Sequence, residues 1–174
     1  MDALGIPDAV GPVVGWRAWR IGEGGSDGMP MRLQSIAFPC EWPVREVLGA
    51  RCYQAQRSHA LEVPVKRCRC GIYAVHSPRL VFAALHHTEY QVVGEVYLWG
   101  RTVVAKKGWR AERAYPKRLC VLDGEARDTA AAVAGLEVYG VRVEVMGRDE
   151  LAHQPPTAAE PPGVWRRFCR WMLG

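Results

Sequence analysis

The amino-acid sequence predicts an α+β protein with a mixed or antiparallel sheet, two or three helices and a metal-stapled loop region. Three observations predict this class. Several segments are rich in Val, Trp and Tyr, which favour strands. Two other segments have the boundary residues of helices. A polar, irregular stretch at residues 40–70 contains four of the six cysteines. With 174 residues, the chain is long enough to bury a core without disulfides.

The first half of the expected sheet comes from apolar segments near the N-terminus. Residues 14–21 and 31–38 are predicted strands, separated by a glycine-rich loop at 22–28. Residues 91–105 are rich in Val, Tyr and Trp and suit a long strand buried on both faces. The sheet therefore depends on segments that are far apart in the sequence.

The long strand is expected to return through a hairpin. Lys106, Lys107 and Gly108 predict a tight turn in which Gly108 supplies a positive φ, and 109–115 is the returning strand. Residues 141–146 alternate Val with Arg and Glu, the pattern of a half-buried strand.

Two helices are expected between these strands. Ser77 followed by Pro78 is typical of an N-cap and first helical position, and this helix should run to about His87. The Ala-rich residues 125–139 predict a second helix, with Gly140 as its C-terminal stop.

The chain divides into three parts by composition. Residues 1–152 form the predicted α+β domain, and 153–163 contain four prolines, which exclude a regular helix and indicate an extended linker. Residues 164–174 form a predicted basic amphipathic tail helix. We expect no secretory signal and no transmembrane segment, because the longest apolar runs are far shorter than about 20 residues. The expected location is the cytoplasm, where disulfides are the least favoured use of cysteine.

Cys52, His59, Cys68 and Cys70 form a C-x6-H-x8-C-x-C pattern, the main candidate site. Thiolate and imidazole are ligands that zinc prefers, and four of them close a tetrahedral site with no place for a catalytic water. A [2Fe–2S] cluster on the same residues is the alternative cofactor, and unligated thiols beside a surface histidine are the alternative to any metal. Cys40 is a possible substitute ligand.

Basic residues lie beside this pattern, and two further cysteines lie elsewhere in the sequence. Lys66, Arg67 and Arg69 add positive charge, which would offset the net negative charge of a Cys3His zinc site. Cys120 lies in an apolar run and is expected in the core, and Cys169 lies in the tail.

Three segments carry a resemblance to a known family. They are 68–74 (Cys-Arg-Cys-Gly-Ile-Tyr-Ala), 94–100 (Gly-Glu-Val-Tyr-Leu-Trp-Gly) and 108–116, which begins Gly-Trp-Arg-Ala-Glu-Arg. Across about residues 14–146 the chain resembles an uncharacterised family of small actinobacterial and phage proteins. The resemblance implies a shared site made by a Cys, a His and a Cys-x-Cys pair, here Cys52, His59, Cys68 and Cys70. It implies no activity.

A basic, aromatic hairpin is the candidate nucleic-acid surface. Its composition fits base stacking on Trp and Tyr and phosphate contacts from Lys and Arg, although a solvated hairpin with buried aromatics explains it too. The basic residues concerned are Arg101, Lys106, Lys107, Arg110, Arg113, Lys117 and Arg118. Residues 101–118 carry a net +6 and the tail +3, so the rest of the chain carries −4 of the total +5. Any anionic partner should meet the protein at these two elements.

The tail is the candidate partner-binding or membrane-binding segment. On a helix its apolar and basic side chains fall on different faces, which favours docking in the protein's own groove, in a partner's groove or on an anionic membrane surface. The apolar face holds Trp165, Phe168 and Trp171, and the basic face holds Arg166, Arg167 and Arg170.

No catalytic Ser–His–Asp order, P-loop or G-x-G-x-x-G motif is present in the sequence. An enzymatic function is therefore the less favoured hypothesis. We expect a non-enzymatic binding or adaptor module with a structural zinc site, whose tail docks on a protein partner. The alternatives are a nucleic-acid-binding regulator that uses residues 101–118 and an iron–sulfur redox sensor.

Overall fold

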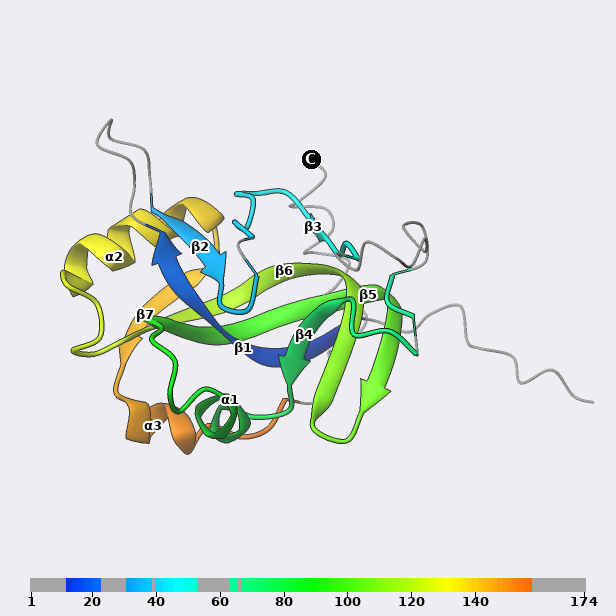
Figure 1. The fold of residues 1–174 in the computed structure, drawn as a ribbon. Coiled ribbons are helices and arrows are strands. Elements are labelled where there is room, and N and C mark those ends of the chain that lie inside the picture. The colour runs from blue at the N-terminus through cyan, green and yellow to red at the C-terminus, as the bar shows by residue number, and fades with distance from the viewer. Residues whose placement is uncertain (1–11, 23–30, 39, 53–62, 66, 158–174) are drawn as a thin grey trace, which may run out of the picture.

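The computed structural model describes residues 12–22, 31–38, 40–52, 63–65 and 67–157, and these have the expected α+β architecture (Figure 1). A seven-stranded mixed sheet is combined with three α-helices. The strands are β1 (Val13–Gly22), β2 (Arg32–Ser35), β3 (Leu48–Gly49), β4 (Ile72–Val75), β5 (Val92–Ala105), β6 (Gly108–Leu122) and β7 (Arg142–Met146). The helices are α1 (Pro78–Ala84), α2 (Thr129–Leu136), which continues as the 3-10 turn η1 (Glu137–Tyr139), and α3 (Arg148–Ala152).

Four of the strands pair in a closed ring. Strand β5 pairs with β1 and with β6, β6 pairs with β4, and Trp16 of β1 pairs with Val75 of β4. Strand β2 extends the sheet from β1, whereas β3 and β7 both pair with β6. The β6–β7 pair is parallel and the others are antiparallel, so the sheet is mixed. Because β6 is long, it pairs with four other described strands and organises the molecule.

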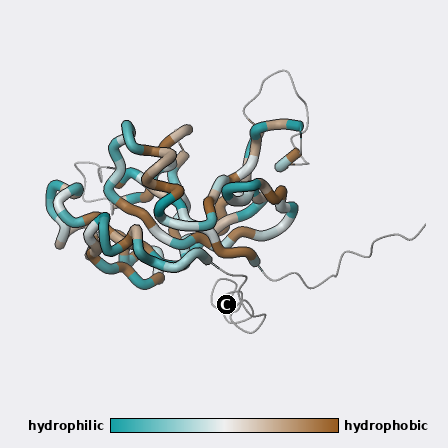
Figure 2. The backbone as a smooth tube through the Cα atoms, turned by 90° about the horizontal axis from the view of Figure 1, so that it is seen from below, coloured by the Kyte–Doolittle hydropathy of each residue, from teal (hydrophilic) through white to brown (hydrophobic). Residues whose placement is uncertain are grey.

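The sheet contributes side chains to two hydrophobic clusters. Trp19 of β1 belongs to the larger cluster, which also receives Leu136 of α2. Trp16 belongs to the second cluster with Val81 of α1 and Leu151 of α3. Positions three apart on a strand face opposite sides, so β1 supplies both clusters. Figure 2 shows hydrophobic stretches of backbone running through the middle of the described fold and hydrophilic stretches at many of its outer bends.

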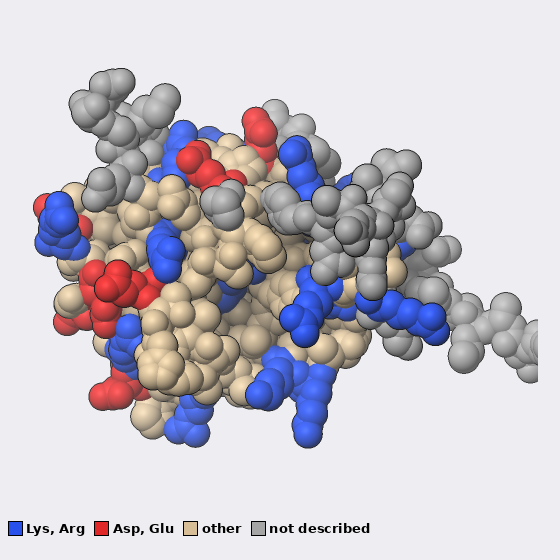
Figure 3. Space-filling model, in the orientation of Figure 1, with Lys and Arg blue, Asp and Glu red and all other residues tan. Residues whose placement is uncertain are grey.

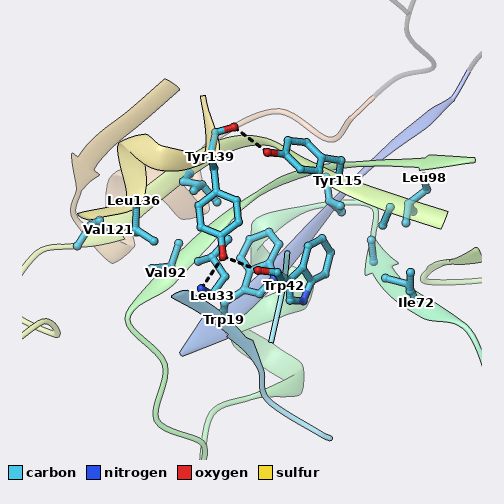
Figure 4. Close-up of a cluster of buried hydrophobic side chains, with 14 of the residues drawn as sticks. Trp19, Leu33, Trp42, Ile72, Val92, Leu98, Tyr115, Val121, Leu136 and Tyr139 are labelled. Carbon is cyan, nitrogen blue, oxygen red and sulfur yellow. Dashed lines mark hydrogen bonds between the residues drawn. The ribbon is translucent and has the colours of Figure 1, made fainter. Parts of the chain in front are cut away.

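Tyr139 connects η1 to the sheet inside the larger cluster (Figure 4). Its hydroxyl accepts a hydrogen bond from the Leu33 amide (2.9 Å) and donates one to the Trp42 carbonyl (2.8 Å). The Tyr115 hydroxyl donates to the Tyr139 carbonyl at 2.8 Å. Trp42 packs edge-on against Trp19 with ring centroids 5.3 Å apart. These buried bonds fix the segment after β2, which leads on to β3 and the candidate site.

The predicted strands at 14–21, 31–38 and 141–146 are confirmed, although β2 has only four residues. The long strand expected at 91–105 is confirmed as β5, but only its first half is buried on both faces. Its second half leads into the hairpin turn, where Val104 is 75% exposed.

The hairpin turn forms at Lys106 and Lys107 as predicted, but the reason given for Gly108 is wrong. The glycines with positive φ in the described ranges do not include Gly108. A Cβ at Gly108 would instead lie 2.0 Å from the Ala74 carbonyl oxygen of β4. Glycine is therefore required here by the close approach of two strands rather than by backbone conformation.

Both predicted helices are present with shifted ends. Helix α1 begins at Pro78 after an extended Ser77, but it ends at Ala84 rather than near His87. Helix α2 begins four residues later than predicted, because the Asp128 carboxylate caps it by accepting a hydrogen bond from the Ala131 amide. Gly140 ends the turn after α2 with a φ of 66°, as the sequence predicted.

Three short elements were not predicted: β3, β4 and α3. Helix α3 ends at Ala152, where the proline-rich segment begins. Thr157 in that segment still donates a backbone hydrogen bond to the His76 carbonyl at 3.1 Å. The rest of the predicted linker and the whole predicted tail, 158–174, lie outside the described residues.

Candidate metal centre

The candidate centre forms where two short strands meet end to end on β6. Strand β3 pairs with Ala114 and Arg113, and the next residue, Ala50, donates a hydrogen bond to the Glu112 carbonyl at 2.7 Å. Strand β4 pairs with the residues of β6 from Ala111 back to Gly108. Cysteines two residues after Ala50 and two residues before β4 are therefore brought together, although they are far apart in the sequence.

The sulfur atoms of Cys52, Cys68 and Cys70 lie within 4.8 Å of one another and could hold a metal ion. Cys68 and Cys70 are buried, and Cys52 is half-buried. The Sγ atoms of Cys52 and Cys68 are 3.8 Å apart. Two thiolates on one tetrahedral zinc, each about 2.3 Å from the metal, lie about 3.8 Å apart. One of the three sulfur pairs thus has the spacing expected of two ligands on a single tetrahedral ion.

The backbone around the Cys-x-Cys pair is folded into a tight loop. The Cys68 amide donates a hydrogen bond to the Val65 carbonyl at 3.0 Å, and the Val65 amide donates to the Cys70 sulfur at 3.5 Å. Gly71 follows with a φ of +117°, and a Cβ there would meet Pro64 at 2.9 Å. An amide aimed at a sulfur stabilises a thiolate, so this loop suits a metal ligand better than a plain buried thiol.

Arg110 of β6 holds the loop from outside. Its guanidinium donates to the carbonyls of Cys68 and Cys70, the latter at 3.0 Å, and to the Val65 carbonyl at 3.4 Å. The guanidinium also lies over the Tyr73 ring, 5.8 Å from its centroid. One half-buried cation therefore fixes three carbonyls of the cysteine loop and adds positive charge beside it.

Arg110 was predicted only as a nucleic-acid contact, and its role at the cysteine loop was missed. An internal repeat in the sequence carries the missed signal, because 15–18 and 108–111 both read Gly-Trp-Arg-Ala. The Arg of the first copy, Arg17, donates to the Tyr73 carbonyl at 2.6 Å. The two copies lie on opposite sides of β4. Arg17 binds the carbonyl of Tyr73 within β4, and Arg110 binds the carbonyl of Cys70 just before β4.

Burial raises the pKa of the Cys70 thiol above its ordinary value of 9.0, and the nearby Cys68 and Cys52 sulfurs raise it further. The Val65 amide acts in the opposite direction. Without a metal the thiol therefore stays protonated at neutral pH. Binding a metal ion would displace that proton.

The other predicted ligands and cysteines lie apart from the three-cysteine group or outside the described residues. His59 lies outside the described residues. Cys40 is half-buried and does not belong to the three-cysteine group; its thiol donates to the Glu41 carbonyl at 3.7 Å. Cys120 is fully buried in the core as predicted. The basic residues Arg67 and Arg69 beside the pair are exposed.

The candidate nucleic-acid residues do not share one environment. Besides Arg110, two others form ion pairs inside the sheet: Lys117 with Glu95 at 3.6 Å, and Arg118 with Glu95 and Glu144. The exposed members are Arg101, Lys106, Lys107 and Arg113. Figure 3 shows Lys and Arg without acidic neighbours over the end of this face that carries β4 and the β5–β6 turn. Nucleic-acid binding there stays a prediction.

The predicted tail residues Trp165, Arg166, Arg167, Phe168, Arg170 and Trp171 lie outside the described residues. None of the helices in the described ranges is long and apolar enough to cross a membrane.

No protein-family model, curated protein or solved structure matches this chain. The resemblance to a family of small actinobacterial and phage proteins therefore stays a prediction.

Proposed function

We propose that Cys52, Cys68 and Cys70 bind one zinc ion, with His59 as the fourth ligand, in a structural site. The observation that carries this proposal is the group of three sulfurs within 4.8 Å, supplied by segments that flank β3 and β4. Three thiolates and one imidazole make a closed tetrahedral zinc site with a net charge of −1. The ion would connect these two short strands, each of which pairs with other strands over only a few residues.

The alternative cofactor is a [2Fe–2S] cluster, and the sulfur arrangement favours a single ion over it. Such a cluster divides its four ligands between two irons, so its protein sulfurs spread around two centres. Here all three sulfurs lie within 4.8 Å of one another, which favours ligands gathered on one ion over ligands divided between two irons. Visible absorption of the purified protein distinguishes the two, because zinc sites are colourless.

A closed site leaves no position for a substrate or a catalytic water, so the proposed role is non-enzymatic. We assign the protein to the class of binding or adaptor modules, in which residues 164–174 dock on a protein partner. What supports this is the division of the tail into an apolar face with Trp165, Phe168 and Trp171 and a basic face. Eleven residues are too few for a stable helix alone, so docking would supply its order.

The test compares two single thiol replacements in the full chain. Cys68→Ser should lose zinc, measured by elemental analysis, and should lower the melting temperature. Cys40→Ser is the matched control, because Cys40 is a half-buried thiol outside the group, and it should retain one zinc per chain. Equal zinc content in the two variants would contradict the proposed site.

The tail proposal has its own test. Deletion of residues 164–174 should abolish partner capture while zinc content stays at one per chain. Capture that survives the deletion would contradict the adaptor role of the tail. Retention on heparin that survives it and is lost on adding salt would favour the nucleic-acid alternative at the exposed hairpin residues.

A further inference from the structure

A pocket of about 330 Å³ opens beside the cysteine loop and takes no part in the proposed zinc site. Its walls come from β1, the segment after β2, β3 and the start of β4, so residues from four distant parts of the chain converge there. Figure 3 shows a hollow near the middle of the face between the segments that carry β2, β3 and β4. The volume is at the lower end of the range of small-molecule sites.

The pocket has a mostly apolar wall, and its charged lining residues are all positive. Its described lining includes three arginines, Arg17, Arg51 and Arg69, and no acidic residue. Most of the other lining side chains are apolar, and two large ones, Phe38 and Tyr73, are 53% and 45% exposed. Large apolar side chains exposed together around a concavity mark binding sites more often than bare surface.

Arg17 is the most informative of the three cations. One nitrogen donates to the Tyr73 carbonyl at 2.6 Å and another to the Ser35 hydroxyl at 3.1 Å, which fixes the guanidinium in place. Its Nε is buried and has no hydrogen-bond partner among the described residues. Burial lowers the pKa of Arg17 to about 10, so the group stays charged at neutral pH although it has lost much of its hydration. The described residues offer this cation no carboxylate partner.

We propose that this pocket binds a small organic anion with an apolar body, whose carboxylate or sulfonate faces Arg17, Arg51 and Arg69 and whose body contacts Phe38 and Tyr73. The arginines supply charge-assisted hydrogen bonds, and the aromatic rings supply apolar contact area. The ligand function would be additional to the zinc site, and Arg51 and Arg69 are sequence neighbours of its proposed cysteine ligands.

Two dyes with one skeleton separate charge from apolar contact. The probes are 8-anilinonaphthalene-1-sulfonate and its uncharged analogue N-phenyl-1-naphthylamine, titrated by fluorescence into the full chain. The sulfonate should bind with a Kd at least about tenfold lower than that of the neutral dye, because the arginines interact with its charge. Equal affinity would show that the negative charge contributes nothing to binding in the pocket, and would overturn the proposal.

Charge-matched variants locate the binding. Arg51→Gln with Arg69→Gln removes two exposed cations at the pocket and should raise the Kd of the sulfonate about fivefold or more. Lys106→Gln with Lys107→Gln removes the same charge from the hairpin turn and should change the Kd less than twofold. Equal weakening in the two pairs would mean diffuse attraction by net charge and would overturn the proposal. Zinc content is measured in parallel, so loss of the metal site is recognised separately.

A filling variant tests the location without changing charge. Gly49 lines the pocket, and a Cβ there meets no atom within 4 Å, so Gly49→Leu has room to fold. The larger side chain should occupy the space and raise the Kd of the sulfonate tenfold or more. Unchanged dye binding to this variant would place the dye elsewhere and refute the assignment.

Discussion

The Arg110 guanidinium and the Cys70 carbonyl oxygen are joined by a 3.0 Å hydrogen bond that ties the cysteine loop to β6. The same side chain also binds the carbonyls of Cys68 and Val65. An arginine can make these contacts at once because its donors are held in a planar fork. The geometry of the proposed zinc site therefore depends on a residue that contributes no ligand atom.

Arg110→Lys should weaken zinc binding while the ligands stay intact. A lysine ammonium cannot span three carbonyls, so the loop would lose the support that orients Cys68 and Cys70. Loss of such outer contacts typically lowers metal affinity by about 10–100-fold. Competition with a zinc chelator measures the change. Arg113→Lys is the control, because Arg113 is exposed on the same strand and pairs only with Glu112 in the described ion pairs. Similar affinities of the two variants would contradict the role of Arg110.

Gly108→Ala should destabilise the fold strongly. The added Cβ would lie 2.0 Å from the Ala74 carbonyl oxygen, so β4 and β6 would have to separate. Overpacking of this kind lowers the free energy of unfolding by about 1–3 kcal/mol or more, which chemical denaturation measures.

Gly147→Ala is the matched control for Gly108→Ala. A Cβ at Gly147 meets no atom within 4 Å, and its φ of −70° suits any residue. We expect a change within about 0.5 kcal/mol. If both variants unfold at the same denaturant concentration, the close contact between β4 and β6 is not present in solution.

Much of the fold could be predicted from local composition, since the β5–β6 hairpin and the Gly140 stop depend on residues near in sequence. Strand β4 could not. It has only four residues, with Ile72 and Ala74 buried and Tyr73 exposed, and such short alternation is common in loops. It becomes a strand because β6, more than 30 residues later, provides its hydrogen bonds.

Part of the candidate site could be predicted from the sequence and part of it could not. The spacing of Cys52, Cys68 and Cys70 was sufficient to predict that they meet, and their sulfurs do lie together. The support from Arg110 was not predicted, because a local reading treats a basic residue in a hairpin as solvated. The repeated Gly-Trp-Arg-Ala segment was the one sequence signal that indicated related positions for Arg17 and Arg110 on either side of β4.

Tyr139→Phe should lower stability without changing the overall fold. The variant leaves the Leu33 amide and the Trp42 carbonyl without their buried partner, which costs about 1–3 kcal/mol for an unsatisfied group. Tyr73→Phe is the comparison, since the Tyr73 hydroxyl makes an exposed hydrogen bond to the Arg69 carbonyl. Denaturation curves should show a clear loss for the first variant and a change below about 0.5 kcal/mol for the second. Equal losses would contradict the role of the buried hydroxyl.

Alkaline pH should destabilise the protein through Cys120. Burial raises its pKa from 9.0 to about 12, although nearby Arg118 opposes the shift and Glu144 and Glu95 add to it. Its contribution to stability is therefore complete below pH 9 and is lost as the pH rises towards 12, because the unfolded chain releases the proton first. The wild type should lose about 1–2 kcal/mol more than Cys120→Ala between pH 8.5 and 10.5. Parallel pH profiles of the two proteins would contradict the raised pKa.

The central claim is that the three sulfurs and His59 hold a zinc ion, and elemental analysis of the freshly purified full chain tests it most directly. We predict one zinc per chain in a colourless protein. Purified protein that holds no stoichiometric metal, or that is coloured and contains iron instead, would contradict the account.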